Sequence, residues 1–200
     1  MKLALFDFDG TLTTRETFAA FLRHATPPLR RTLASVLLLP LVPAYRRGWL
    51  SGVAMRAMAT RIALSGRDAS DIADAGEAFA RDVIPSLLRP DAIAALRTHR
   101  DAGDRVIVVS GAFELYVAPW CAREGVDCLA SRLEIRHGRL SGQYLGPQCV
   151  GEEKAVRVRA LCDPTEFASV HAWGDTPEDA ALLALAHRRV YRGKEWNPTP

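Results

Sequence analysis

The 200-residue sequence lacks several features that would assign it to a special class of protein. It has only four cysteines and no Cys-x-x-Cys pair, so it encodes no zinc site of that type, and we expect the four to be reduced thiols. Its net charge is only +3, and it lacks the dense Lys/Arg patch interleaved with aromatics that is typical of nucleic-acid-binding proteins. The first residues show no long apolar region of the signal-peptide type, so we expect a cytoplasmic protein.

The sequence does contain enough apolar material for a large core. Hydrophobic residues make up 48% of the chain, and the 24% of charged residues argues against disorder. This length allows one domain of ordinary size or a compact domain that carries an insertion.

Strand and helix patterns divide the chain into two parts. Residues 2–6, KLALF, predict a buried strand, because a continuous apolar run follows Lys2. From residue 14 to 88 apolar residues recur at helical spacing, with proline and glycine breaks and no strand pattern, which predicts a helical domain. From residue 89 to 200 strands and helices alternate, so this part and residues 1–13 are predicted to form an α/β domain with a parallel, doubly wound sheet.

Proline and glycine mark the boundaries of the predicted elements in the second half of the chain. Pro90 lies at the start of one predicted helix and Gly103 just after its end. The pattern predicts helices over 90–102, 114–124, 152–162 and 177–186, strands over 105–110, 128–130, 169–175 and 188–192, and a hairpin over 132–146 that turns at His137-Gly138.

Polar side chains stand at the ends of three predicted strands. Asp7 follows the first strand, Ser110 ends the second, and Asp175 ends the strand over 169–175. Ligands of doubly wound sheets bind at the carboxyl ends of the strands. We therefore expect these three side chains to meet at one edge of the sheet.

Clustered carboxylates at such an edge repel one another unless a cation lies between them. Hard oxygen ligands favour Mg²⁺, and four carboxylates are candidates for its site: Asp7, Asp9, Asp175 and Asp179. A carboxylate beside Mg²⁺ can act as a nucleophile on a phosphoryl group, and a second one can serve as general acid and base. Ser110 and Lys154 are the candidates for neutralising the phosphoryl charge.

Four short motifs carry a resemblance to a known family. They are DFDGT (7–11), VVSG (108–111) at a strand end, GEEK (151–154) before a helix, and GDTPED (174–179). In this order they resemble the motifs of haloacid-dehalogenase-like (HAD) phosphatases over nearly the whole chain. The resemblance implies a Rossmannoid core with a parallel sheet and an inserted helical cap, of the C1 type found in subfamily IB. It also implies Mg²⁺-dependent hydrolysis of a phosphomonoester through an aspartyl-phosphate intermediate.

The resemblance implies a role for each acidic residue of these motifs. Asp7 would be the nucleophile and a metal ligand. Asp9 would be the general acid and base, with its backbone carbonyl on the metal. Asp175 would be the third protein ligand, and Asp179 would orient the site or hold a metal-bound water.

The phosphoryl group would be held by a second set of residues. By the same resemblance, Ser110 and Lys154 would bind its oxygens, with help from backbone N–H groups around Phe8, Asp9 and Gly111.

Residues of the predicted cap leave two substrate classes open. Glu16 and Arg61 resemble the residues of phosphoserine phosphatases that contact the substrate amine and carboxylate. The fourth motif departs from the usual GDGAND of those enzymes, because Thr176, Pro177 and Glu178 replace Gly, Ala and Asn. The apolar VLLLPLVPAY (36–45), CVGEEK (149–154) and HRRVYRG (187–193) also resemble the bacterial C-type phosphatidylglycerophosphate phosphatases, which act on a lipid headgroup.

Residues 32–45 form an uncharged run between two arginine pairs. The run is too short for a membrane-spanning helix, which needs about 20 apolar residues, and it contains two prolines. It is either a helix buried in the helical domain or an apolar face for peripheral contact with the inner side of a membrane. Of the two, we expect the buried or protein-contacting helix.

A function of another class is a non-hydrolytic protein that keeps an aspartyl phosphate, as receiver domains do. Receiver domains place the phosphorylated aspartate after a later strand and lack a large cap. Asp9 also argues against it, since without this acid and base the phosphoenzyme should persist. The sequence predicts no oligomeric state.

Overall fold

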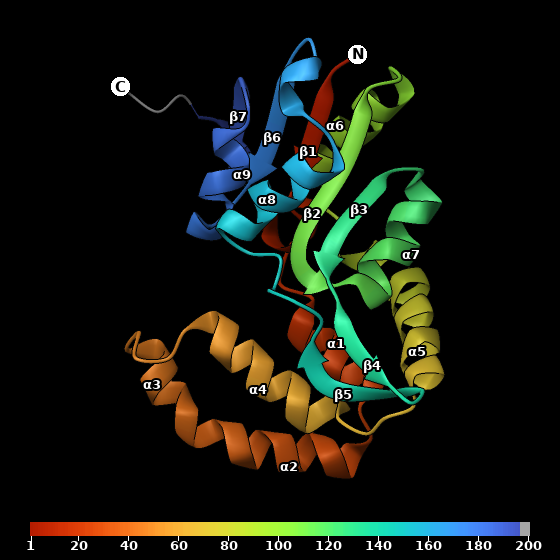
Figure 1. The fold of residues 1–200 in the computed structure, drawn as a ribbon, viewed down its shortest axis with the longest axis vertical. Coiled ribbons are helices and arrows are strands. Elements are labelled where there is room, and N and C mark those ends of the chain that lie inside the picture. The colour runs from red at the N-terminus through yellow and green to blue at the C-terminus, as the bar shows by residue number, and fades with distance from the viewer. Residues whose placement is uncertain (197–200) are drawn as a thin grey trace.

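The computed structural model describes residues 1–196, and it confirms the predicted α/β class (Figure 1). The central sheet has the strand order β3-β2-β1-β6-β7-β8. Strands β3 to β7 in this order run parallel, and only β8 is antiparallel. Their bounds are β1 Leu3–Phe6, β2 Arg105–Phe113, β3 Asp127–Ser131, β6 Val170–Gly174, β7 Arg188–Tyr191 and β8 Lys194–Glu195.

The first strand, β1, lies in the middle of the sheet because all of its side chains are apolar. Leu3 to Phe6 have no exposed surface, and β1 pairs with β2 on one side and with β6 on the other. Alternate side chains of a strand point to opposite faces. Ala4 and Phe6 thus join one hydrophobic cluster and Leu3 and Leu5 the other.

Helices cover both faces of the sheet. Helices α6 (Pro90–Asp101) and α7 (Glu114–Glu124) contribute to the cluster that contains Phe6. Helices α8 (Glu152–Leu161) and α9 (Ala180–Ala184) contribute to the other cluster. This three-layer arrangement leaves the carboxyl ends of β1, β2 and β6 at one edge.

Five helices lie between β1 and α6, and within residues 14–88, all of which are described, there is no strand. They are α1 Phe18–Ala25, α2 Pro28–Leu38, α3 Val42–Arg46, α4 Gly52–Leu64 and α5 Ala69–Asp82. Phe21 of α1 and Phe79 of α5 pack against Tyr116 of α7, with ring centroids 4.8 Å and 5.1 Å from that ring. The helical segment therefore shares a hydrophobic cluster with the sheet.

The predicted hairpin forms a separate two-stranded sheet, β4 (Leu133–Arg136) and β5 (Arg139–Tyr144), with its turn at His137-Gly138. Its backbone bonds to the segment between α4 and α5. Gly66 N donates to Leu140 O at 2.8 Å, and Leu140 N donates to Arg67 O at 2.9 Å. The division into a core (1–13 and 89–200) and a cap (14–88) stays a prediction, and these bonds attach the hairpin to the cap side of that division.

Two predicted boundaries are wrong. Strand β2 does not end at Ser110 but continues to Phe113, with a register shift against β3 between these residues. The helix predicted over 177–186 begins as a 3₁₀ turn, Pro177–Asp179, and α9 ends at Ala184. Local sequence gives no signal for β8, which pairs only with the neighbouring β7.

The segment 32–45 is not buried, which corrects the expectation of a buried helix, whereas its helix α2 does contact α4, as expected for a protein-contacting helix. Helix α2 has no buried residue, and Leu29 and Val36 are 86% and 63% exposed. In Figure 1, α2 is the outermost helix of the insertion, at the end of the molecule farthest from the sheet. Among residues 1–196, no helix combines the length and apolar character that crossing a membrane requires.

Candidate active site

The site begins at the carboxyl end of β1, where Asp7 is held by the sheet. Its backbone N–H donates to Trp173 O in β6 at 3.0 Å, and the residue is only 5% exposed. The turn that follows, Phe8–Leu12, contains Gly10 at a φ of 80°. A side chain at Gly10 would collide with the carboxylate of Asp175, so glycine lets these two segments approach each other.

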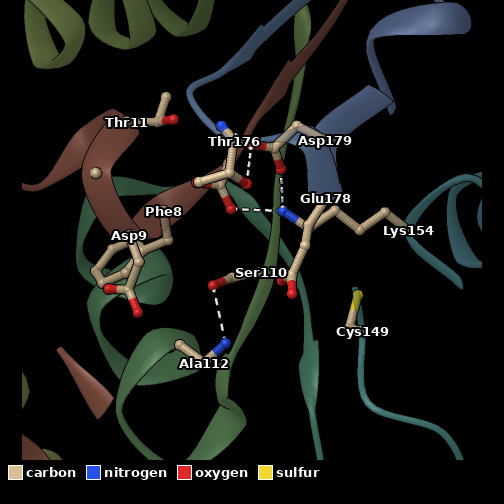
Figure 2. Close-up of polar contacts among 12 residues, drawn as sticks. Phe8, Asp9, Thr11, Ser110, Ala112, Cys149, Lys154, Thr176, Glu178 and Asp179 are labelled. Atoms are coloured by element: carbon tan, nitrogen blue, oxygen red, sulfur yellow. Dashed lines mark hydrogen bonds and ion pairs between the residues drawn. The ribbon is translucent and has the colours of Figure 1, made fainter. Parts of the chain in front are cut away.

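Lys154, in the first turn of α8, connects the carboxylates from two motifs. Its Nζ donates to Asp7 Oδ1 at 2.6 Å and to Asp179 Oδ1 at 2.5 Å (Figure 2). Burial by itself would lower the pKa of Lys154, but the charges of Asp7 and Asp179 outweigh it and raise this pKa. The ammonium group therefore stays charged.

Asp179 fixes the loop after β6. Its Oδ2 accepts hydrogen bonds from the backbone N–H groups of Asp175 and Thr176, both at 3.0 Å. Burial would raise the pKa of Asp179, but the charge of Lys154 and these hydrogen bonds lower it. Asp179 is thus an ionised residue that sets the conformation of the loop.

Three carboxylates converge on one point. Ligand oxygens of Asp7, Asp175 and Asp179 all lie within 4.8 Å of one another. Lys154 balances Asp179, and burial followed by the neighbouring Asp179 charge raises the pKa of Asp7 to about 8. Burial also raises the pKa of Asp175, with Asp179 adding to the effect. The negative charge of these three carboxylates exceeds the single positive charge of Lys154. Such a group of oxygen donors fits a divalent metal such as Mg²⁺.

Asp9 points away from this cluster and toward the start of α1. Its Oδ1 accepts hydrogen bonds from Thr17 N at 3.0 Å and from Thr17 Oγ1 at 2.6 Å. Thr17 Oγ1 also lies 2.9 Å from the Tyr116 hydroxyl. Burial raises the pKa of Asp9 to about 7, although the Thr17 bonds oppose this. A carboxyl group with a pKa near 7 is suited to give and take a proton.

Ser110 and Gly111 lie where β2 becomes irregular. Ser110 is fully buried, and its Oγ accepts a hydrogen bond from Ala112 N at 3.1 Å (Figure 2). A side chain at Gly111 would clash with Val150 Cγ1 at 2.6 Å. Both residues line the same small cavity as Asp7 and Lys154. The structure therefore brings together the four residues predicted to carry the chemistry, Asp7, Asp9, Ser110 and Lys154.

The cavity at this edge is small, with a volume of about 50 Å³. It lies between the sheet edge and the helical insertion, and Glu16 and Phe18 contribute to its wall. Pockets for small molecules usually measure about 300–1,000 Å³. The cavity is therefore smaller than a pocket that holds a substrate of ordinary size.

The predicted cap arginine is not at this cavity. Arg61 is exposed and its Cα lies under the hairpin at Gly142, whereas Arg56 of the same helix lines the cavity. Residues five apart on a helix are rotated by about 140°, so both cannot face one point. Arg61 as a substrate-binding residue stays a prediction that this placement does not favour.

Sequence reasoning missed Arg56 and its partners. Arg56 Nε donates to Gln148 Oε1 at 3.0 Å, and Arg56 Nη2 lies 3.3 Å from Glu178 Oε1. Nothing in the spacing of α4 distinguishes Arg56 from Arg61. Thr17 was also missed, although a threonine just before an amphipathic helix is a recognisable start signal.

The chain is similar to known proteins in both sequence and structure. The family model described as haloacid dehalogenase-like hydrolase matches residues 4–184. Protein CicA of Caulobacter vibrioides is 37% identical over 201 residues, covering 96% of this chain and 87% of CicA.

Two solved structures share the fold. A protein of unknown function from Bordetella pertussis Tohama I superposes with a TM-score of 0.79 at 28% identity, covering 94% of this chain and 88% of that one. A substrate-bound phosphoserine phosphatase gives a TM-score of 0.68 at 20% identity, covering 95% and 85%. At 20% identity this second likeness shows the fold alone.

Proposed function

Because the chain belongs to the haloacid dehalogenase-like hydrolase family, we propose that it is a Mg²⁺-dependent phosphatase that hydrolyses a phosphomonoester through a phospho-Asp7 intermediate. The observation that carries the proposal is the position of Asp7. It is a buried carboxylate at the end of the central strand, in contact with Lys154 and within 4.8 Å of two further carboxylates.

In the first step Asp7 acts as the nucleophile. One Oδ forms a bond to phosphorus while the bond from phosphorus to the substrate oxygen breaks. Asp9, with a pKa near 7, gives its proton to that leaving oxygen, which departs as an alcohol. Lys154 and Ser110 bind the oxygens of the transferring group and stabilise its charge.

In the second step Asp9 works in reverse. It takes a proton from a water molecule, whose oxygen attacks phosphorus as the bond to Asp7 breaks. Inorganic phosphate leaves, and Asp7 and Asp9 return to their starting states. The bonds from Thr17 to Asp9 hold the carboxyl group in place for both transfers.

The metal would be held by Asp7 and Asp175 and by the backbone carbonyl of Asp9, with Asp179 setting the loop. When bound, Mg²⁺ supplies positive charge that neutralises the phosphoryl oxygens. The raised pKa values of Asp7 and Asp175 support this assignment, because burial and the neighbouring Asp179 charge disfavour the ionised carboxylates, which a bound cation would stabilise.

The resemblance of Glu16 to the residue of phosphoserine phosphatases that contacts the substrate amine favours a small amino-acid-like phosphomonoester as substrate. Glu16 lies at the cavity and would contact a substrate amine. Arg56 lies there too, but it is bonded to Gln148 and Glu178, so a substrate carboxylate would have to displace those partners.

A lipid phosphate is the second candidate, and a groove favours it. A groove of about 430 Å³ lies between α1, α2 and α4, lined mainly by apolar side chains such as Leu22 and Leu38. Phe18 lines both this groove and the small cavity at Asp7. An acyl chain in the groove would place its headgroup beside Phe18, toward the cavity.

Phosphate release is the test, measured with Mg²⁺ and with chelator. The panel holds a chromogenic aryl phosphate, phosphoserine, several sugar phosphates and phosphatidylglycerophosphate in detergent. We expect release only with Mg²⁺, and none from Asp7→Asn. Substantial turnover by Asp7→Asn would contradict the nucleophile assignment.

Asp9→Asn tests the intermediate separately. We expect a phosphoryl group to accumulate on the peptide that contains Asp7, detected by mass spectrometry after acid quench. If wild type forms a stable phosphoenzyme but releases no phosphate, the non-hydrolytic alternative replaces the phosphatase. Unchanged turnover by Asp9→Asn would remove its acid and base role.

A further inference from the structure

We propose that the helical insertion docks on an anionic membrane surface through an exposed apolar face. This α2 face consists of seven side chains on α2 and the segment that follows it: Leu29, Leu33, Val36, Leu37, Leu39, Tyr45 and Trp49. The proposal does not depend on the activity proposed above, because it concerns where the protein lies and not what it hydrolyses.

The apolar residues of α2 form one stripe that points to solvent. Leu29, Leu33, Val36 and Leu37 are spaced by three and four residues, which places them on one side of a helix. They are 86%, 53%, 63% and 50% exposed. Leu39 and Trp49 continue this surface at 70% and 79%. Scattered exposed apolar residues are ordinary, but a contiguous set marks an interaction site.

The opposite side of α2 is already occupied by the protein. Arg30 donates to Ser65 O at 2.8 Å, and Ala34 and Leu38 line the groove toward α4. Helix α2 is thus anchored on its inner side and cannot turn its stripe inward without losing these contacts. Figure 1 places α2 at the end of the molecule, with no helix or strand of residues 1–196 beyond it in this view.

The charge around the α2 face has one sign. Residues 17–67 contain eight arginines and no lysine, aspartate or glutamate, although the whole chain has a net charge of only +3. The rest of the chain is therefore net negative. Arg46 and Arg47, in the segment that follows α2, are exposed close to Tyr45 and Trp49 of this face. A surface that is both apolar and basic is complementary to a bilayer with anionic headgroups.

The excess of arginine also argues against two other partners for the α2 face. A second copy of the chain meeting this face symmetrically would bring two sets of arginines together without an acidic partner. A nucleic acid would match the charge but would leave the apolar stripe in water. A bilayer with anionic headgroups matches both the apolar stripe and the arginines.

The aromatic side chains fit the boundary between headgroups and acyl chains. Tyr45 and Trp49 are 47% and 79% exposed, and Trp and Tyr are enriched at membrane interfaces. The Arg47 guanidinium lies 5.6 Å from the centre of the Trp49 ring, so charge and ring are presented together. Helix α2 would lie in the plane of the membrane, with its stripe a few ångströms deep.

Vesicle sedimentation tests the proposal with the full chain. We expect binding to phosphatidylglycerol/phosphatidylcholine vesicles, weaker binding as salt rises, and little binding to phosphatidylcholine alone. Emission of the exposed Trp49 should shift to the blue with the anionic vesicles, and the Trp49→Phe variant should lose that shift.

Two variants with the same change in charge separate the α2 face from a general effect. Leu33→Glu/Leu37→Glu should weaken partitioning into anionic vesicles by about tenfold or more, because each change removes a leucine from the surface that the membrane would cover. Val156→Glu/Leu161→Glu, at exposed positions on α8, should bind like wild type. Hydrolysis of a soluble aryl phosphate should be the same in both.

The proposal is overturned by any of three results. One is wild-type protein that does not sediment with anionic vesicles. Another is an equal loss of binding in both double variants. The third is sedimentation velocity showing a dimer that only the Leu33→Glu/Leu37→Glu variant disrupts, which would make the α2 face a subunit interface.

Discussion

At the scale of single residues, Lys154 is the only cation among residues 1–196 in contact with two buried carboxylates. It is 2% exposed, and it bonds to both Asp7 and Asp179. A buried ion pair adds little net stability, but removal of one partner leaves uncompensated charge. Loss of Lys154 therefore affects the fold as well as any binding of a phosphoryl group.

We expect Lys154→Met to lower the free energy of unfolding by about 3–5 kcal/mol. Urea denaturation in the presence of chelator measures this directly. Lys194→Met is the control, because Lys194 is exposed and should leave the unfolding midpoint unchanged. If both variants unfold at the wild-type midpoint, the carboxylates are balanced by something other than Lys154.

His171 in β6 gives a pH dependence that does not involve the candidate metal site. Its Nδ1 lies 3.3 Å from His99 Nε2, and burial followed by the neighbouring His99 lowers its pKa below 6.5. The unfolded chain therefore binds a proton more readily than the folded chain. Stability is expected to fall as pH drops through about 6.5 and below.

Thermal unfolding between pH 8 and pH 5 measures this effect. We expect the melting temperature of wild type to decrease on acidification and that of His171→Gln to decrease less. His137→Asn, at an exposed turn, should follow wild type. Parallel curves for wild type and His171→Gln would show that another group controls the acid sensitivity.

Strand patterns alone predicted the position of a site residue only where that residue follows a strand of the sheet. Asp7 and Asp175 follow neighbouring parallel strands, so their meeting could be foreseen from strand patterns alone. Lys154 lies on a helix, and only the motif resemblance singled it out. The choice between Arg56 and Arg61 depends on how α4 is rotated, which is set by its contacts with α2 and β5 and not by local sequence.

At the scale of elements, an ion pair joins the helical insertion to the loop after β6. Arg56 of α4 lies 3.3 Å from Glu178, whose side chain is 45% exposed. Arg56 and Glu178 both line the cavity at Asp7. Opening the cavity by moving α4 away from this loop would break the pair, so the pair opposes opening. Exposed pairs of this kind contribute about 0–1 kcal/mol.

We expect Arg56→Gln and Glu178→Gln each to raise hydrogen exchange in α4, by up to about fivefold for a loss of 1 kcal/mol. Exchange of peptides from residues 52–64, followed by mass spectrometry, measures this. The double variant should exchange no faster than Arg56→Gln alone, because that change already removes both the pair and the bond from Arg56 to Gln148. Additive increases would mean that the two residues act through separate contacts.

Arg81→Gln is the matched control at the element scale. Arg81 pairs with its neighbour Asp82 within one exposed stretch, so its loss should leave α4 unchanged. Comparison of Arg56→Gln with Arg81→Gln therefore distinguishes the loss of an ion pair between two elements from the loss of an ion pair between sequence neighbours.

The order of strands and helices could be predicted well because the spacing of apolar residues along the sequence follows the local geometry of a helix or a strand. Strand β1 and helices α6, α7 and α8 start or end within a residue or two of the predicted limits. The exposure of α2 could not be predicted. Its apolar pattern is the same whether the stripe meets another helix or solvent, and only the complete packing decides.

At the scale of the whole molecule, charge is distributed unevenly between its two ends. The arginines of residues 17–67 lie in the insertion, while Asp7, Asp9, Asp175 and Asp179 gather at the sheet edge. A membrane on the α2 face and a metal at the sheet edge would each balance one of these charges. The two sites would then differ in response to ions, because salt screens the exposed face and acts little on the buried cluster.

We expect the stability of the whole fold to depend on divalent metal, because three carboxylates meet at the buried acidic cluster. A ligand that binds only the folded state stabilises it by RT ln(1 + [L]/Kd), about 2.7 kcal/mol at a hundredfold excess over Kd. Thermal unfolding with Mg²⁺ should therefore occur at a higher temperature than unfolding with chelator. Asp175→Asn should abolish most of this difference, whereas Asp74→Asn, at an exposed position on α5, should keep it. Stabilisation by Mg²⁺ that is equal in wild type and Asp175→Asn would place the metal elsewhere, and the cluster would then be an acidic network balanced by Lys154 alone.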